Sequence, residues 1–336
     1  MLEKKIALLT SVTFNNIGNG FIDLGAEAAL MKALPLNAEL FKVSSNANFA
    51  ATMGQMFMLK ENPIINWLWV HTMQRAAKKL HDRSYKTVKT QNIFSMASMV
   101  KCDYFIIPGC VLTVPFFTIY GDLIKRKAEQ GSKIIFLGAS GNFYTEYEVK
   151  FVSEYLRKLR PYAIMTRDSL AYKYYANFTK NSYNGIDNVF FVNLLNLPQI
   201  DTDLTPYVVL NIEEPKHYRI KEELKNIFKE KNIVYSYHKP FPYTKVSKLV
   251  KNGVIVSDNP MDYLLLYRNA SEVYSDIHAC IPTLAFGNKA RLFSNSPRIA
   301  LFENAKIPDV RERLVSIEGL KEMQDKQIAF LASLLQ

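Results

Sequence analysis

The feature that most constrains this chain is a repeated alternation of short apolar runs with segments of helical period. Such an alternation is typical of parallel sheets whose two faces are covered by helices. In the first part of the chain it predicts strands at residues 6–12, 39–44, 104–108, 133–138 and 163–166. It predicts helices between them at residues 23–34, 64–80, 122–130, 146–159 and 169–175.

A stretch with little periodicity and two prolines, LLNLPQIDTDLTP at residues 194–206, separates this alternation from a second one. The second predicts strands at residues 207–212, 233–237, 253–256, 272–274 and 298–302, and helices at 221–230, 261–268, 279–286 and 318–334. At 336 residues the chain also exceeds the usual size of a single core. We therefore predict an α/β protein of two Rossmann-like domains, residues 1–195 and 207–315, facing each other across a cleft. A C-terminal helix, residues 316–336, could cross back to the first domain.

Composition narrows the class of partner. The hydrophobic fraction of 49% and charged fraction of 22% are ordinary for a soluble globular protein. The formal net charge of +11 favours acidic partners, such as phosphate-bearing small molecules or anionic glycolipid carriers. Because the basic residues are spread along the chain and no recognition-helix, zinc or RNA-sheet motif is found, we expect no nucleic-acid partner.

Three widely spaced cysteines suggest neither a disulfide framework nor a zinc site, and they favour the reducing cytoplasm. We expect no metal, no signal peptide and no membrane span. The predicted helix at residues 64–80 combines an apolar stripe with the basic residues Arg75, Lys78 and Lys79. Such a helix is usually a core helix with a solvated side. The alternative is peripheral contact with the inner membrane surface, where a lipid-linked sugar would be met.

The residues that follow the strands are the candidates for a binding site, because open α/β sheets bind ligands at the carboxyl ends of their strands. After the first strand comes a turn with Asn16, Gly18 and Asn19, just before a helix. A helix N-terminus of this kind attracts anions. The other interpretation is a tight turn in which Asn and Gly supply left-handed backbone conformations.

Two further strand ends carry small or charged residues. Ser140, Gly141 and Asn142 follow the fourth strand, and small residues there allow a close approach of backbone to a ligand or to a neighbouring loop. Arg167 follows the fifth strand, and its planar fork suits a carboxylate or a phosphate. Arg167 could instead form an ion pair with Asp168 or a pair that joins the domains.

The order of these motifs resembles the polysaccharide pyruvyl transferase family. It comprises the Asn/Gly turn, the strand DYFII, the segments TRDS and DNVFFV, and finally SDIHA before an apolar helix. The resemblance covers roughly residues 5 to 310. It implies a two-domain, glycosyltransferase-B-like (GT-B-like) fold. It also implies transfer of the enolpyruvyl unit of phosphoenolpyruvate to a sugar of a surface polysaccharide or its lipid-linked precursor, which forms a pyruvate ketal. Phosphoenolpyruvate would be a donor substrate, and no cofactor is implied.

The sequence departs from the family's pattern at two places. Asn19 stands where the first loop usually has an aspartate, and Asp276 stands where an arginine usually precedes the histidine by two positions. An acid at position 276 would repel an anionic donor, so catalytic competence is in doubt. Lys306 matches the place of the family's late lysine after an insertion, and Lys289 is a rival.

On this resemblance His278 is the acid/base, because an imidazole titrates near neutral pH and ketal formation needs several proton transfers. Asp276 could orient that imidazole. Arg167 and Lys306, or Lys289, would neutralise the donor's phosphate and carboxylate. His278 could instead only cap the helix that follows it. Three function classes remain open: pyruvyl transfer, nucleotide-sugar-dependent glycosyl transfer on a GT-B fold, and a non-catalytic role in polysaccharide biosynthesis.

Overall fold

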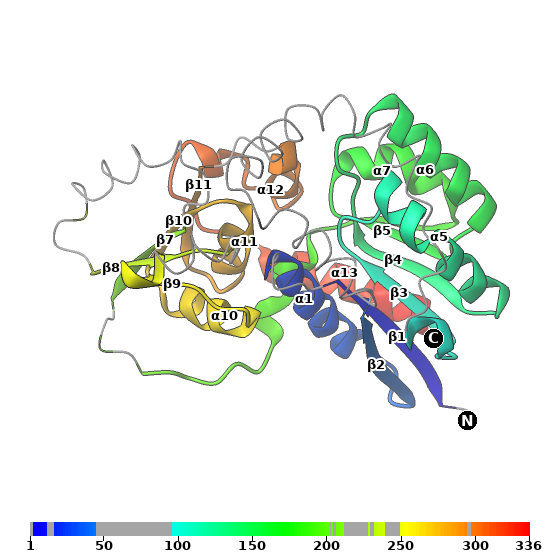
Figure 1. Ribbon diagram of the computed structural model, residues 1–336, viewed down its shortest axis with the longest axis horizontal. Helices are drawn as coiled ribbons and strands as arrows, with labels where there is room; N and C mark the ends of the chain where they lie inside the picture. The colour runs from blue at the N-terminus through cyan, green and yellow to red at the C-terminus, as the bar shows by residue number, and fades with distance from the viewer. Residues whose placement is uncertain are drawn as a thin grey trace, which may run out of the picture.

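The computed structural model describes residues 3–11, 17–44, 96–201, 203, 206–211, 228, 232–238, 249–293 and 297–336. Two parallel sheets lie at opposite ends of the molecule, with helices between and around them (Figure 1). The first sheet has the order β2-β1-β3-β4-β5-β6. Its strands are β1 (Lys4–Thr10), β2 (Ala38–Ser44), β3 (Tyr104–Pro108), β4 (Lys133–Ala139), β5 (Ala163–Thr166) and β6 (Asn181–Asn184). The apolar strand β3 is buried at every position, as expected of a sheet covered on both faces.

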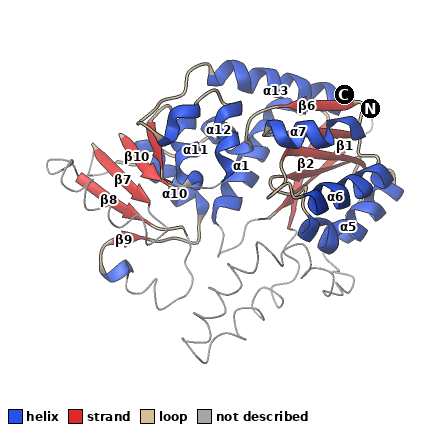
Figure 2. Ribbon diagram, turned by 90° about the horizontal axis from the view of Figure 1, so that it is seen from above, coloured by secondary structure: helices blue, strands red, loops and turns tan. Residues whose placement is uncertain are grey.

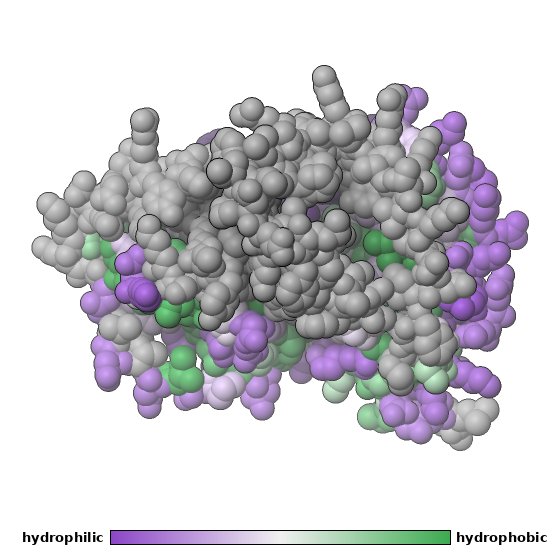
Figure 3. Space-filling model, in the orientation of Figure 1, coloured by the Kyte–Doolittle hydropathy of each residue, from purple (hydrophilic) through white to green (hydrophobic). Residues whose placement is uncertain are grey.

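Two layers of helices cover this sheet. Its helical elements are α1 (Ile17–Ala33), α4 (Met96–Met99), α5 (Val114–Glu129), α6 (Glu146–Leu159), α7 (Ser169–Tyr175), η1 (Ala176–Phe178) and η2 (Asn188–Leu194). Residues of α5, α6 and α7 share one core with one face of the sheet, and α1 shares another core with the opposite face. Thr113, Thr145 and Asp168 each accept a backbone N–H at the start of α5, α6 and α7. At the outer edge, near α5 and α6, the described surface is mostly hydrophilic (Figure 3).

The second sheet has the order β11-β10-β7-β8-β9 and is also parallel. Its strands are β7 (Tyr207–Asn211), β8 (Asn232–Ser236), β9 (Val254–Ile255), β10 (Glu272–Ser275) and β11 (Lys289–Leu292). The remaining helical elements are α10 (Pro260–Asn269), α11 (Ile277–Ala285), η4 (Pro297–Ile299), α12 (Ala300–Asn304) and η5 (Pro308–Arg311), followed by the C-terminal helix α13 (Leu320–Leu335).

Helix α1 belongs to both halves of the molecule. Its N-terminal part packs with η2, α10 and α11 in one core, so Phe21 makes edge contacts with the rings of His238, Tyr263 and Tyr267. A Cβ at Gly25 would lie 1.9 Å from the carbonyl oxygen of Asn188, so only glycine permits this approach to η2. Seen from above, α1, α11 and α12 lie between the sheets (Figure 2). The two domains therefore share a hydrophobic core where they meet.

The C-terminal helix α13 lies against the first sheet, not the second. Leu331, Leu334 and Leu335 join the core that α1 forms with β1 and β3. Nζ of Lys4 donates a hydrogen bond to the carbonyl oxygen of Leu335 at 3.0 Å, so the two ends of the chain meet. The chain thus crosses back to the first domain after building the second.

The structure corrects several predicted elements. The predicted strand at 298–302 is the short helical pair η4 and α12, from which Leu301 and Phe302 enter the core that also contains α11. The helices predicted from residues 23 and 122 begin earlier, at Ile17 and Val114. Strands β6 and β11 were not predicted, because both are short and carry polar or charged residues. The predicted helix at 64–80 lies outside the described residues, and so does that at 221–230, apart from residue 228.

Candidate functional site

The carboxyl ends of the two sheets face each other, each at the point where its strand order reverses. In the first sheet β2 lies on one side of β1 and β3 on the other. In the second sheet β8 lies on one side of β7 and β10 on the other. The chain leaves these strands through α1, the β3–α5 loop and α11. Such reversal points are where open parallel sheets bind ligands, because the connections diverge there and leave a crevice.

A pocket, here called the inner pocket, lies between these strand ends. It has a cavity volume of about 50 Å³. Its wall is made by residues of α1, of the loops after β3 and β5, of η2 and its cap, and of α11, η4 and α12: Asn19, Ile22, Cys110, Arg167, Asp187, Val189, Ile277, His278, Ile281, Arg298 and Leu301. The structure thus brings Asn19, Arg167 and His278, three predicted site residues, to one pocket from both domains. Asn16 lies outside the described residues.

Arg167 is held by a buried ion pair, which differs from the predicted partner Asp168. Its Nη1 lies 2.6 Å from Oδ2 of Asp187, and the two side chains are 3% and 1% exposed. Nε and Nη2 donate to Oγ of Ser140 at 2.9 and 2.8 Å. Burial lowers the pKa of Arg167, but the carboxylates of Asp187 and Asp168 and the thiol of Cys110 together outweigh burial, so the pKa of Arg167 is raised. Arg167 therefore stays charged, with its charge balanced inside the first domain.

His278 is the second residue of α11 and packs directly on the first turn of α1. A Cβ added at Gly18 would lie 2.2 Å from Nδ1 of His278. Glycine is therefore required at position 18 for the imidazole to reach the helix N-terminus, which explains one of the small residues in the predicted turn. The imidazole is partly exposed and lines the inner pocket. The start of α11 in the second domain thus lies against the first turn of α1 in the first domain.

Asp276 does not line the inner pocket. It is 9% exposed and occupies the N-cap position of α11, where its backbone carbonyl accepts hydrogen bonds from the N–H groups of Ala279 and Cys280. Its side chain makes no capping hydrogen bond. Burial and the carboxylate of Asp276 together raise the pKa of the Cys280 thiol. These contacts belong to the start of α11, and they add no negative charge to the pocket wall.

The two predicted lysines lie elsewhere, and the structure supplies a different cation. Lys289 begins β11 beside Glu272, at the amino end of the second sheet and so opposite to the pocket. Lys306 is exposed just after α12, where its charge acts on Glu322 of α13. Arg298, which is not among the predicted site residues, lines the inner pocket from η4. A signal was available, since Arg298 and Leu301 are spaced three apart, but the run was interpreted as a strand.

A second pocket, here called the outer pocket, adjoins the first and shares Arg298 and Leu301 with it. Its cavity volume is about 90 Å³. The remaining lining residues come from the loop after β4, from the start of α7 and from α12: Ser140, Gly141, Asn142, Phe143, Tyr144, Asp168, Leu170 and Ala300. The predicted residues Ser140, Gly141 and Asn142 thus lie together, in a compartment beside that of His278.

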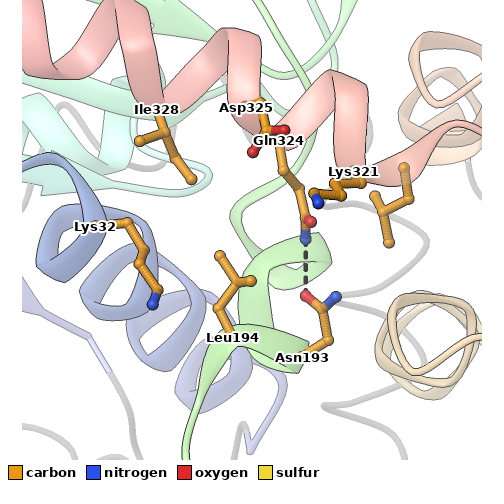
Figure 4. Close-up of a pocket in the computed structure, with 8 residues that line it drawn as sticks. Lys32, Asn193, Leu194, Lys321, Gln324, Asp325 and Ile328 are labelled. Atoms are coloured by element: carbon orange, nitrogen blue, oxygen red, sulfur yellow. Dashed lines mark hydrogen bonds between the residues drawn. The ribbon is translucent and has the colours of Figure 1, made fainter.

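A larger hollow lies between α1, η2 and α13, away from the strand ends (Figure 4). Its cavity volume is about 570 Å³, and Lys32, Lys321 and Asp325 stand on its wall. Nε2 of Gln324 donates to Oδ1 of Asn193 there at 2.7 Å. It contains none of the residues that the sequence singled out. Within the described part of the chain no cluster of His, Cys, Asp or Glu could hold a metal ion, and no helix is long and apolar enough to cross a membrane.

Comparison with known proteins establishes the fold. No family model and no curated protein matches the sequence. A structure assigned as a UDP-N-acetylglucosamine 2-epimerase from Listeria monocytogenes is similar, with a TM-score of 0.55, 9% identity, and 98% of this chain and 96% of that chain covered. The UDP-GlcNAc 2-epimerase from Neisseria meningitidis bound to UDP-GlcNAc is similar with a TM-score of 0.51 and 11% identity, and the match covers 99% of this chain and 94% of that chain. The S. aureus MnaA complex with UDP is similar with a TM-score of 0.50 and 10% identity, and the match covers 98% of this chain and 90% of that chain. The predicted GT-B-like α/β fold, with parallel sheets in two domains, is confirmed.

Proposed function

We propose that this chain is a nucleotide-sugar-dependent glycosyltransferase that binds the diphosphate of its donor at the inner pocket, whose volume of about 50 Å³ leaves the nucleoside and the sugar outside it. The observation that carries the proposal is that the reversal points of both parallel sheets converge on one pocket with net positive charge. Two arginines, Arg167 and Arg298, and one acid, Asp187, line it. A diphosphate that bridges the domains would meet the N-terminus of α1 on one side and Arg298 on the other.

The chemistry assigned to the pocket is displacement at the anomeric carbon of the donor sugar. The bond from this carbon to the diphosphate oxygen breaks, the bond to an acceptor hydroxyl oxygen forms, and the nucleoside diphosphate leaves with the bonding electron pair. Arg298 and the first turn of α1 would stabilise the charge that develops on the leaving group. His278 would take the proton of the acceptor hydroxyl. Arg167, held by Asp187, would position Ser140 and the pocket wall.

Similar folds support this class of ligand. The Neisseria meningitidis epimerase is described with UDP-GlcNAc and the S. aureus protein with UDP. At 10–11% identity they share a fold with this chain, and the ligand comes to it as part of the proposal. We therefore choose UDP and UDP-GlcNAc as the first probes.

The test is a thermal-shift titration with UDP, UDP-GlcNAc and phosphoenolpyruvate. A ligand at about 100 times its Kd stabilises the folded state by about 2.7 kcal/mol, which a melting curve resolves. We expect stabilisation by UDP and UDP-GlcNAc in wild type and a weaker effect in Arg298→Ala. Lys289→Ala, which removes an exposed cation at the far end of the second sheet, is the matched control. If millimolar UDP and UDP-GlcNAc leave the melting temperature unchanged, the proposal fails.

Pyruvyl transfer remains the second candidate, because Arg298 supplies the cation that the sequence lacks at position 276. A histidine and two arginines around one compact pocket suit an anionic donor such as phosphoenolpyruvate. The acceptor would again be a sugar or a lipid-linked saccharide. Stabilisation by phosphoenolpyruvate at a concentration where UDP has no effect would favour this candidate over glycosyl transfer.

A further inference from the structure

The outer pocket differs chemically from the inner one, although they share a wall. Its polar groups are already hydrogen-bonded within the first domain. The hydroxyl of Tyr144 donates to the carboxylate of Asp168 at 2.8 Å and accepts from the N–H of Gly141 at 2.9 Å. Asp168 also accepts from the N–H of Ala171 at 2.7 Å, as the cap of α7. The N–H of Asn142 donates to Glu148 at 3.0 Å.

These bonds keep the pocket wall neutral or negative, apart from Arg298 at the border. Burial and the neighbouring Asp168 raise the pKa of Tyr144, so this hydroxyl keeps its proton throughout the physiological pH range. The carboxylate of Asp168 is 4% exposed and would repel a second anion. The outer pocket is therefore a poor place for a phosphate group, in contrast with the inner pocket.

Apolar side chains stand on the same wall. Phe143 and Leu170 are each 44% exposed, and Ala300 and Leu301 line the pocket beside them. An aromatic ring beside a few fixed polar groups is how proteins hold molecules that have one apolar face and a polar rim. A pyranose ring has this character, because its axial C–H groups form a face and its hydroxyl groups form the rim.

We propose that the outer pocket is the acceptor subsite and that it holds a neutral sugar ring against Phe143 and Leu170. This inference rests on the proposed glycosyl transfer and names the second substrate of that site. The shared wall of Arg298 and Leu301 puts the acceptor next to the donor, as a direct displacement requires. An epimerase acts on one sugar and needs no such compartment, so acceptor binding here distinguishes transfer from epimerisation.

The test uses ligand-observed NMR with a panel of methyl glycosides of the common hexoses and N-acetylhexosamines. We expect wild type to bind at least one glycoside and Phe143→Ala to weaken that binding about tenfold, as loss of one aromatic contact predicts. Leu170→Ala should have a smaller effect in the same direction. Tyr172→Ala, which removes a side chain of α7 that is 37% exposed and lies outside the pocket lining, should leave binding unchanged.

Titration of UDP into the same variants separates this inference from the proposed function. Phe143→Ala should keep the wild-type affinity for UDP, because Phe143 does not line the inner pocket. Glycoside binding that Phe143→Ala weakens, in a protein that ignores UDP, would sink the glycosyltransferase proposal and leave the sugar subsite standing. Absence of binding to every methyl glycoside of the panel, or binding that Phe143→Ala leaves unchanged, would overturn the subsite.

Discussion

The carboxyl ends of the two sheets meet at one site but are built differently. On the first sheet Ser140, Arg167 and Asp187 are between 1% and 4% exposed, and their charges and hydrogen bonds are satisfied within the domain. In the second domain, His278 and Arg298 are partly exposed and line the inner pocket. The first domain therefore supplies a preorganised wall, including the first turn of α1, and the second supplies the partly exposed side chains that we propose bind the ligand. Substitutions on the first side should therefore cost stability, and substitutions on the second side should cost binding.

The largest expected effect is a loss of folding stability when the wall formed by the first domain is changed. Asp187→Ala leaves Arg167 buried without its ion-pair partner and removes the cap of η2, where Oδ1 of Asp187 accepts from Val189. Loss of one partner of a buried pair costs about 3–5 kcal/mol. The urea concentration at which half of the protein is unfolded should be clearly lower for Asp187→Ala than for wild type. Asp309→Ala, whose pair with Arg313 is exposed, should change stability by less than about 0.5 kcal/mol. Equal effects of the two variants would refute the distinction.

The next largest effect is on the affinity for UDP, through the side chains that the second domain contributes to the inner pocket. Arg298→Ala would remove the proposed charge-assisted contact to the donor's diphosphate, worth about 1.5–3 kcal/mol. This corresponds to a roughly tenfold to hundredfold rise in the Kd for UDP measured by calorimetry. Lys306→Ala, which changes a neighbouring exposed cation outside both pockets, is the control and should keep the wild-type Kd. If Lys306→Ala loses as much affinity for UDP as Arg298→Ala, the loss reflects overall positive charge and not a contact made by Arg298.

The contact between the two walls can be tested by a double-mutant cycle. Gly18→Ala introduces a Cβ where the imidazole of His278 lies, and such overpacking costs about 1–3 kcal/mol. In the His278→Ala background the clash is gone, and Ala should instead be better than Gly in a helix by up to about 1 kcal/mol. Urea unfolding of the four proteins gives the coupling energy. Additive effects would show that Gly18 and His278 do not touch in solution.

The smallest effect concerns the hydrogen bonds behind the outer pocket. Tyr144→Phe removes the hydroxyl between Asp168 and Gly141 and should cost about 1 kcal/mol at neutral pH. Because the folded-state pKa of Tyr144 is raised, its contribution is present below the unfolded pKa of about 10 and is lost as the pH rises above it. The difference in unfolding free energy between wild type and Tyr144→Phe should therefore shrink between pH 8 and pH 11. A constant difference would contradict this origin.

The sequence predicted the parts of the fold that depend on local pattern. The apolar strands β3, β4 and β5 and the helix α6 lie where their periodicity indicated, because burial on a defined face leaves a strong signal. The ion-pair partner of Arg167 could not be predicted from the sequence, because Asp187 lies 20 residues away and only the tertiary fold brings the two side chains together. Lys306 and Lys289 were predicted from the place of a lysine in the pyruvyl transferase pattern, whereas Arg298 was overlooked because residues 298–302 were interpreted as a strand.

If one ligand contacts the strand ends of both domains at once, as proposed, hydrogen exchange on addition of UDP will show it most directly. The first turns of α1 and α11 are in different domains and meet through Gly18 and His278. Saturating UDP should protect amides in peptides covering residues 17–24 and 277–285 together, with the same dependence on UDP concentration. Protection confined to one of these peptides, or to neither at saturation, would contradict a single site between the two domains.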